Sequence, residues 1–214
     1  MRRFFYAFIF ILTIISCQEN KEIQKPTKNN SSVETQKKDI WQFDEDLSSI
    51  HWTGYKTTAK VPVSGTFQKF NVQGIKSSPD LWQTVKSARV SIMANSIFSN
   101  EEQRDKKLVQ FLFETMLETQ TIDARIEQIN KEKKSAMLHI SMNGVEKLIL
   151  IKVQVNQEQG KVILNGKIDL LEDFQASNSL EALHKACYDL HTGKDGISKT
   201  WSDVAIKAEL IFKK

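Results

Sequence analysis

The 214-residue sequence lacks an excess of charge of one sign. It contains 30 Lys and Arg residues against 26 Asp and Glu residues, which gives a formal net charge of +4 at pH 7. Two of the positive charges, Arg2 and Arg3, lie in a segment that we expect to be removed, which leaves +2 for the mature chain. No block of five like charges occurs. The sequence therefore has no electrostatic footprint of nucleic-acid binding.

Familiar catalytic motifs are also lacking. The sequence contains no Gly-rich phosphate-binding loop, no Ser/His/Asp arrangement with a defensible spacing, and no paired carboxylates within apolar segments. These patterns would supply a phosphate cradle, an activated nucleophile or an acid/base pair. We therefore expect a protein that is not an enzyme and carries no cofactor.

The apolar run from Phe4 to Ile15 is too short to span a membrane comfortably. Its 12 residues rise about 18 Å as a helix, against roughly 30 Å for the hydrocarbon core of a bilayer. A run of this length behind Arg2 and Arg3 is typical of a secretory signal peptide. We predict that residues 1–16 are this signal peptide.

The end of this run, Ile14-Ile15-Ser16-Cys17, resembles the lipobox of bacterial lipoproteins. In that family the Cys is acylated and becomes the first residue of the mature chain, and several acyl chains at one residue give stable anchoring. The alternative is that Cys17 is an ordinary thiol behind an uncleaved anchor. Polar sequence begins directly after it, at Gln18, and this position favours lipid attachment at Cys17.

The anchor has consequences for location and for the second cysteine. Gln18 is not the aspartate that often retains proteobacterial lipoproteins in the inner membrane, so we expect the outer membrane, with its periplasmic or surface face left open. With Cys17 lipidated, Cys187 has no partner, which excludes a disulfide framework. Residues 17–38 are poor in aliphatic side chains and predict a lipidated Cys followed by a flexible tether.

Residues 39–214 form the predicted domain, and their dominant period is two. Alternating apolar residues predict short strands, and turns are expected at Asn143-Gly144, Gln159-Gly160 and Asn165-Gly166. The pattern indicates a mainly β fold, an antiparallel sheet of about eight strands that closes into a barrel. The segments with this alternation are 50–52, 61–67, 90–94, 122–126, 137–141, 148–155, 162–164, 168–170 and 204–212.

Two segments instead predict short helices. Residues 101–118 have helix-like apolar spacing for part of their length. Residues 179–191 are the clearer helix, with Ser177 or Ser179 as a cap and Gly193 just beyond its end. The apolar stripe of this second helix consists of Leu180, Leu183, Cys187 and Leu190.

The second helix also carries a pattern that suggests metal or thiol chemistry. His184, Cys187 and His191 fall roughly on one face, and Cys with two His suits zinc, while a Cys beside a His could be a nucleophile. Only three ligands are present where a structural site needs four. We therefore favour Cys187 as a core residue and keep a metal-dependent site as the least favoured alternative.

A barrel of about eight strands can be filled by side chains or can hold one apolar ligand. Seven residues are candidates for lining such an interior, and the sequence does not distinguish a ligand cavity from a packed core. These candidates are Trp52, Val63, Phe67, Val90, Ile92, Phe111 and Phe113.

The domain resembles the YceI-like family over about residues 40–214. Four segments in the expected order carry the resemblance. They are Ser49-x-x-Trp52-x-x-x-Lys56 with Val63-x-Gly65-x-Phe67; Ser96-Ile97 with Arg104-Asp105-x-x-Leu108; Asn143-Gly144 before Leu148-Ile149-Leu150; and Trp201-Ser202-Asp203-Val204-x-Ile206.

The resemblance implies a lipocalin-like, periplasmic or secreted barrel that binds a polyisoprenoid or quinone-type lipid without catalysis. It also implies that Arg104 and Asp105 position the segment covering the barrel. This chain has Thr57 where the family usually has His, and the 179–191 helix is not part of the general pattern. We therefore expect a membrane-anchored envelope lipoprotein that binds an amphiphilic lipid, with a filled-barrel interaction module as the alternative.

Replacing Cys17 by Ala tests the anchor. We expect Cys17→Ala to move the protein from the membrane fraction to the soluble fraction, because the only acylated residue is lost. The matched control is Cys187→Ala, which should leave the protein membrane-bound. Continued membrane retention of the Cys17 variant after cell fractionation would contradict the anchor.

Overall fold

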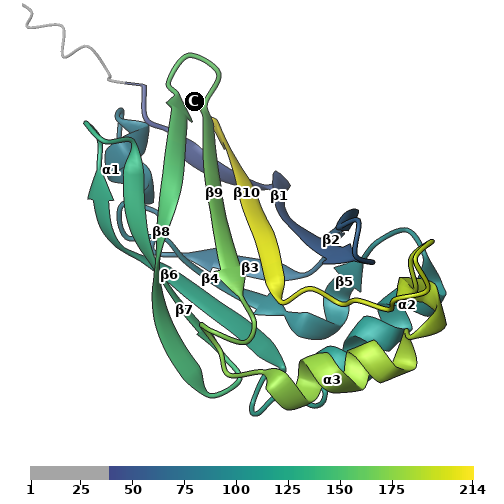
Figure 1. The fold of residues 1–214 in the computed structure, drawn as a ribbon. Coiled ribbons are helices and arrows are strands. Elements are labelled where there is room, and N and C mark those ends of the chain that lie inside the picture. The colour runs from purple at the N-terminus through teal and green to yellow at the C-terminus, as the bar shows by residue number, and fades with distance from the viewer. Residues whose placement is uncertain (1–38) are drawn as a thin grey trace, which may run out of the picture. The chain divides into compact units, whose positions relative to one another are not determined.

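The computed structural model describes residues 39–214 (Figure 1). The predicted signal peptide, Cys17 and the tether lie outside the described residues. The described chain begins and ends at neighbouring positions, since Lys214 Nζ lies 3.8 Å from a carboxylate oxygen of Asp39. No helix in the described part of the chain is long and apolar enough to cross a membrane.

Ten antiparallel strands of the described residues form a single sheet in the order β3-β4-β6-β7-β8-β9-β10-β1-β2-β5. The sheet curls into a half-barrel (Figure 1), which confirms the predicted mainly β, antiparallel fold. The strands are β1 (Gln42–Lys56), β2 (Val61–Phe67), β3 (Phe70–Gln73), β4 (Arg89–Met93), β5 (Ile97–Phe98), β6 (Thr121–Asn130), β7 (Ser135–Met142), β8 (Val145–Asn156), β9 (Lys161–Asp169) and β10 (Asp203–Lys213).

The number of strands exceeds the predicted eight because two of them carry almost no periodic signal. Strands β3 and β5 have only four and two residues, too few for alternation to be recognised. Both lie at the edges of the sheet. Short edge strands of this kind expose few unpaired backbone groups.

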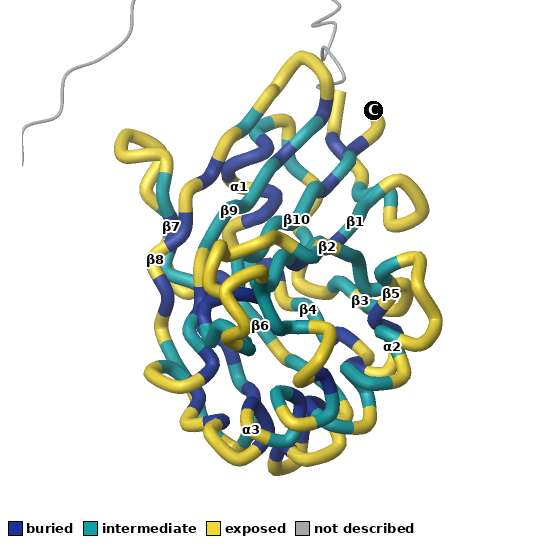
Figure 2. The backbone as a smooth tube through the Cα atoms, turned by 45° about the vertical axis from the view of Figure 1, so that its right-hand side comes forward, coloured by how far each residue is buried: buried dark blue, intermediate teal, exposed yellow. Residues whose placement is uncertain are grey.

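Alternation along the long strands gives the sheet one apolar face. On β8, Ile149, Ile151 and Val153 are buried, whereas the alternate residues Leu148, Leu150 and Lys152 are exposed. Figure 2 shows the same alternation of buried and exposed positions along the strands. Because the buried positions face the inside of the curl, the sheet encloses its own core.

Helices lie near both ends of the half-barrel (Figure 1). Helix α1 (Leu81–Val85) begins with an N-cap at Asp80, whose side chain accepts a hydrogen bond from the Trp82 backbone N–H at 3.0 Å. Helices α2 (Glu102–Leu108) and α3 (Ser177–Ala186) lie together near the other end. Shorter turns are η1 (Ala94–Ser96), η2 (Val109–Phe113) and η3 (Asp189–His191).

The predicted helices are present with different boundaries. The 101–118 segment divides into α2 and the π-helical turn η2. The 179–191 segment divides into α3 and the 3-10 turn η3. The predicted serine cap is wrong, because the N-cap residue is Ala176 and no side chain caps the helix.

Two of the three predicted turns are confirmed and one is wrong. Asn143-Gly144 joins β7 to β8 with positive φ at both residues, and Gly160 has a positive φ between β8 and β9. Asn165-Gly166 instead lies within β9. A Cβ atom at Gly166 would lie 2.7 Å from Ile151 Cγ2, so this glycine permits close packing rather than a turn.

Two glycines on the paired strands β1 and β2 offer a matched test of the packing. A Cβ at Gly65 would lie 2.7 Å from the Trp52 ring and 2.3 Å from the Phe98 carbonyl oxygen, whereas a Cβ at Gly54 meets nothing within 4 Å. We expect Gly65→Ala to lower the free energy of unfolding by about 1–3 kcal/mol, because the core must shift to admit it. Gly54→Ala should change it by less than about 1 kcal/mol. Urea denaturation of both variants measures this, and equal stabilities would contradict the packing.

Candidate functional site

The inner face of the half-barrel is incompletely filled and encloses a cavity of about 330 Å³. Strands from both halves of the sheet supply its walls, and α2, η2 and α3 cover one side. The volume lies within the range of small-molecule sites. Most of the wall consists of aliphatic and aromatic side chains, including Ile50, Ile97, Leu108, Leu112, Ile122, Leu138, Ile140, Met142, Ile151, Leu164, Ile168, Leu170, Val204 and Ile206.

Six of the seven predicted lining residues lie on this wall. They come from β1, β2, β4 and η2, and they are Trp52, Val63, Phe67, Val90, Ile92 and Phe113. The ring of Phe113 packs edge-on against Phe67, with centroids 6.2 Å apart. The structure thus brings these six residues together around one space.

Phe111 is the exception, and its predicted place on the cavity wall is wrong. It packs against the core from a partly buried position but does not line the cavity. Residues two apart share a face in a strand, but they point to nearly opposite sides in a helical turn. Because η2 is helical, Phe113 and the neighbouring Leu112 face the cavity and Phe111 does not.

The prediction missed the aliphatic wall supplied by β7 to β10. Ile140, Ile151, Leu164 and Ile206 belong to strands whose alternation was recognised. Period-two sequence defines two faces for each strand, but the strand on its own does not identify which positions surround a cavity. The register between neighbouring strands supplies this information, for example by pairing Ile206 with Gly166 on β9.

The predicted apolar stripe of residues 179–191 borders the cavity. Leu180 and Leu183 of α3, Cys187 at its C-cap and Leu190 of η3 all line the wall. Burial raises the pKa of the Cys187 thiol, against the opposing effect of Lys107 and Lys56. The thiol is therefore protonated at neutral pH and is poorly suited to act as a nucleophile or metal ligand.

The two histidines beside Cys187 share a hydroxyl group. His184 Nδ1 lies 3.0 Å and His191 Nδ1 lies 2.6 Å from Thr200 Oγ1. Burial, followed by the charge of Lys56, lowers the pKa of His191 to about 4, so its ring is neutral at pH 7. Within residues 39–214 no group of three His, Cys, Asp or Glu side chains is placed to hold a metal ion, and the alternative zinc site does not form there.

Arg104 and Asp105, predicted to position the segment covering the barrel, have different surroundings. The Asp105 carboxylate accepts hydrogen bonds from the Ser99 backbone N–H at 2.9 Å and from its hydroxyl at 2.6 Å. These bonds hold α2 against the end of β5. Arg104 instead lies on the cavity wall.

Known proteins with a similar sequence pattern or a similar fold were identified by comparison. A family model of the YceI-like domain matches residues 41–212. The structure is similar to a polyisoprenoid binding domain from Saccharophagus degradans implicated in plant cell wall breakdown, with a TM-score of 0.57 and 14% identity over 81% of this chain and 97% of that chain. It is also similar to BcnA of Burkholderia cenocepacia, with a TM-score of 0.54 and 16% identity over 81% of this chain and all of that one.

At these identities the structural likeness concerns the fold. A search of curated protein sequences finds no significant match. The matched segment extends from just before β1 almost to the end of β10, so it includes the whole curled sheet. On this match, the chain belongs to the YceI-like domain family.

Proposed function

We propose that this protein binds a polyisoprenoid-type amphiphilic lipid in the cavity of its half-barrel and performs no catalysis. The observation that carries the proposal is the open interior, about 330 Å³ in volume and walled mainly by apolar side chains. The free energy of the system falls when a hydrocarbon chain replaces water against the apolar side chains of the cavity. A long, flexible isoprenoid chain suits a wall assembled from many strands.

Family membership supports this choice of ligand class. A structural neighbour is a polyisoprenoid binding domain, and the described chain has a mainly apolar interior. The alternative function, an interaction module of the cell envelope, predicts a barrel whose interior is filled by side chains. An unfilled space of this size favours lipid binding over that alternative.

The proposed lipoprotein anchor fits the proposed cargo. Acyl chains at Cys17 would hold the domain beside a membrane of the cell envelope, for which the sequence favours the outer membrane. A protein that takes an isoprenoid from a bilayer gains from such proximity, because tethering raises the local concentration of its ligand. The anchor and the lipid site are separate proposals, and each has its own test.

Mass spectrometry of organic extracts tests the lipid site directly. Protein purified from its native membrane should yield an isoprenoid-type lipid in stoichiometric amount, and stripped protein should take up an added quinone or polyprenol. The absence of extractable lipid together with failure of uptake would refute the proposal.

Gly54 allows the cavity to be blocked without disturbing its wall. It lines the cavity, and a Cβ there would enter open space. We expect Gly54→Phe to reduce lipid uptake at least tenfold, because the ring occupies space needed by the ligand, while Gly54→Ala retains most of it. Circular dichroism and thermal unfolding should show that both variants are folded. Unchanged uptake by a folded Gly54→Phe variant would place the ligand elsewhere.

A further inference from the structure

Three positively charged side chains interrupt the apolar wall of the cavity. Lys56 is the last residue of β1, while Arg104 and Lys107 belong to α2. Residues three apart on a helix are neighbours on one face, so the two α2 cations face the cavity together. All three side chains are partly buried.

Lys56 and Lys107 lie near the last turn of α3, and Arg104 lies one helical turn before Lys107 on α2. Lys107 Nζ donates a hydrogen bond of 3.1 Å to the Ala186 carbonyl oxygen, at the end of that helix. Lys56 forms a backbone bridge with Thr200, whose hydroxyl contacts His184 and His191. The charges of Lys56 and Lys107 both act on His191, in agreement with these contacts.

None of these three cations has a carboxylate partner within 4.0 Å among the described residues. Lys207, the remaining cation on the wall, pairs with Glu209. Lysines elsewhere on the sheet are also paired, as with Lys147 and Asp173 at 3.1 Å and Lys161 and Glu209 at 2.6 Å. Lys56, Arg104 and Lys107 thus lie on the cavity wall without the ion pair that Lys207 forms there.

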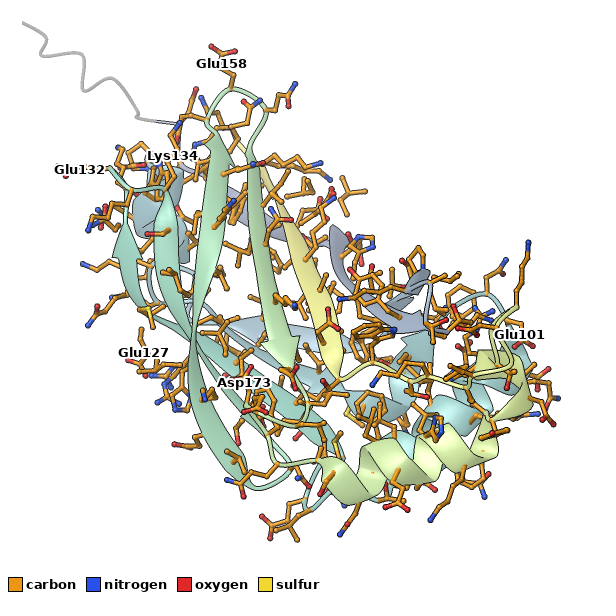
Figure 3. All side chains as sticks on the ribbon, viewed as in Figure 1. Glu101, Glu127, Glu132, Lys134, Glu158 and Asp173 are labelled. Carbon is orange, nitrogen blue, oxygen red and sulfur yellow. The ribbon has the colours of Figure 1, made fainter. Side chains whose placement is uncertain are left out.

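Glu101 is the one acidic residue on the described wall, and its carboxylate has another role. It accepts hydrogen bonds from the backbone N–H groups of Gln103 at 3.0 Å and Arg104 at 2.8 Å, and so caps α2. Figure 3 shows Glu101 at the α2 side of the molecule, far from Glu158 on the β8–β9 loop. The described wall offers no other acidic side chain to the three cations.

Positive charges beside an apolar space are poorly solvated, and an anion bound among them would relieve this cost. Lysine and arginine also form stronger hydrogen bonds with phosphate or carboxylate oxygens than with neutral groups. The part of the wall that β7–β9 supply, including Leu138, Ile140 and Leu164, carries only apolar residues. The cavity is therefore polarised, with a cationic region beside α2 and the end of α3 and an apolar region toward β7–β9.

We propose that the cavity selects an anionic amphiphile, an isoprenoid chain ending in a phosphate or carboxylate, and that Lys56, Arg104 and Lys107 bind its headgroup. This inference rests on the proposed lipid binding and specifies the class of ligand. The Thr200 hydroxyl and the neutral His191 ring lie beside the headgroup position as hydrogen-bonding groups. The isoprenoid chain runs from there along the aliphatic wall.

The test compares two ligands that differ only in the headgroup. Isothermal titration calorimetry of the folded protein with farnesyl phosphate and with farnesol should give an affinity at least tenfold higher for the phosphate. The preference should decrease with added salt, because screening weakens the attraction between charges. Inorganic phosphate alone should bind at least a hundredfold more weakly than farnesyl phosphate, because it lacks the chain.

Charge-removing variants locate the headgroup site. The triple variant Lys56→Gln, Arg104→Gln, Lys107→Gln should lose at least tenfold in affinity for farnesyl phosphate and less than threefold for farnesol. The matched control removes three exposed lysines that form no ion pair within residues 39–214, as Lys69→Gln, Lys133→Gln, Lys152→Gln, and should retain both affinities. If the triple variant does not fold, the single variants Lys56→Gln and Lys107→Gln, with Lys→Arg at each position as rescue, give the same comparison.

The outcomes separate this inference from the proposed function. Equal affinities for farnesol and farnesyl phosphate would overturn the anionic headgroup and leave lipid binding intact. Equal affinities for inorganic and farnesyl phosphate would also overturn it, since the cations would then bind an anion independently of a lipid. Failure of both isoprenoids to bind would overturn the proposed function and this inference together.

Discussion

Strand β1 pairs with β10 along most of its length, from Gln42 opposite Lys213 to Thr53 opposite Ala205. This pairing joins the first strand of the domain to the last, and β1 pairs with β2 on its other side. Inward-facing residues of these strands, such as Trp52 and Ile206, form part of the cavity wall. The wall therefore depends on contacts between residues more than 150 positions apart, which form only when the whole sheet is assembled.

The curl of this sheet determines what the interior can do. An apolar face that closed tightly would fill its own core with side chains, whereas here α2, η2 and α3 cover a space that remains open. Glycines contribute in opposite ways: Gly65 and Gly166 allow neighbouring side chains to pack closely, while Gly54 leaves room in the cavity. The result combines a packed framework with an unfilled centre.

Charge pairing differs between Glu209 on β10 and the cations at the α2 side of the cavity. Glu209 pairs with Lys161 and Lys207, which lower its pKa to about 2. Such partly exposed pairs contribute little to stability. In the cavity, Lys56, Arg104 and Lys107 are partly buried and without carboxylate partners in the described chain. This asymmetry suits a half-barrel whose interior receives an amphiphile with a negative end.

Local sequence pattern was sufficient for the mainly β class, for the Asn143-Gly144 turn and for six of the lining residues, because alternation and turn conformation depend on neighbouring residues. It was insufficient for Phe111 and Asn165-Gly166, where a helical turn and a close packing contact override the local pattern. The short strands β3 and β5 could be identified only from their pairing with β4 and β2 in the structure.

The sequence by itself determined that each long strand has an apolar face. It also predicted a signal peptide, a lipidated Cys and a tether in residues 1–38. Only the tertiary structure decided that the apolar faces enclose a cavity and that Lys56 joins Arg104 and Lys107 beside it. Lys56 and Lys107 are 51 positions apart in the sequence, and no local rule relates them. Strand register and the packing of α2 and α3 bring them together, and these arise from long-range burial rather than from neighbouring residues.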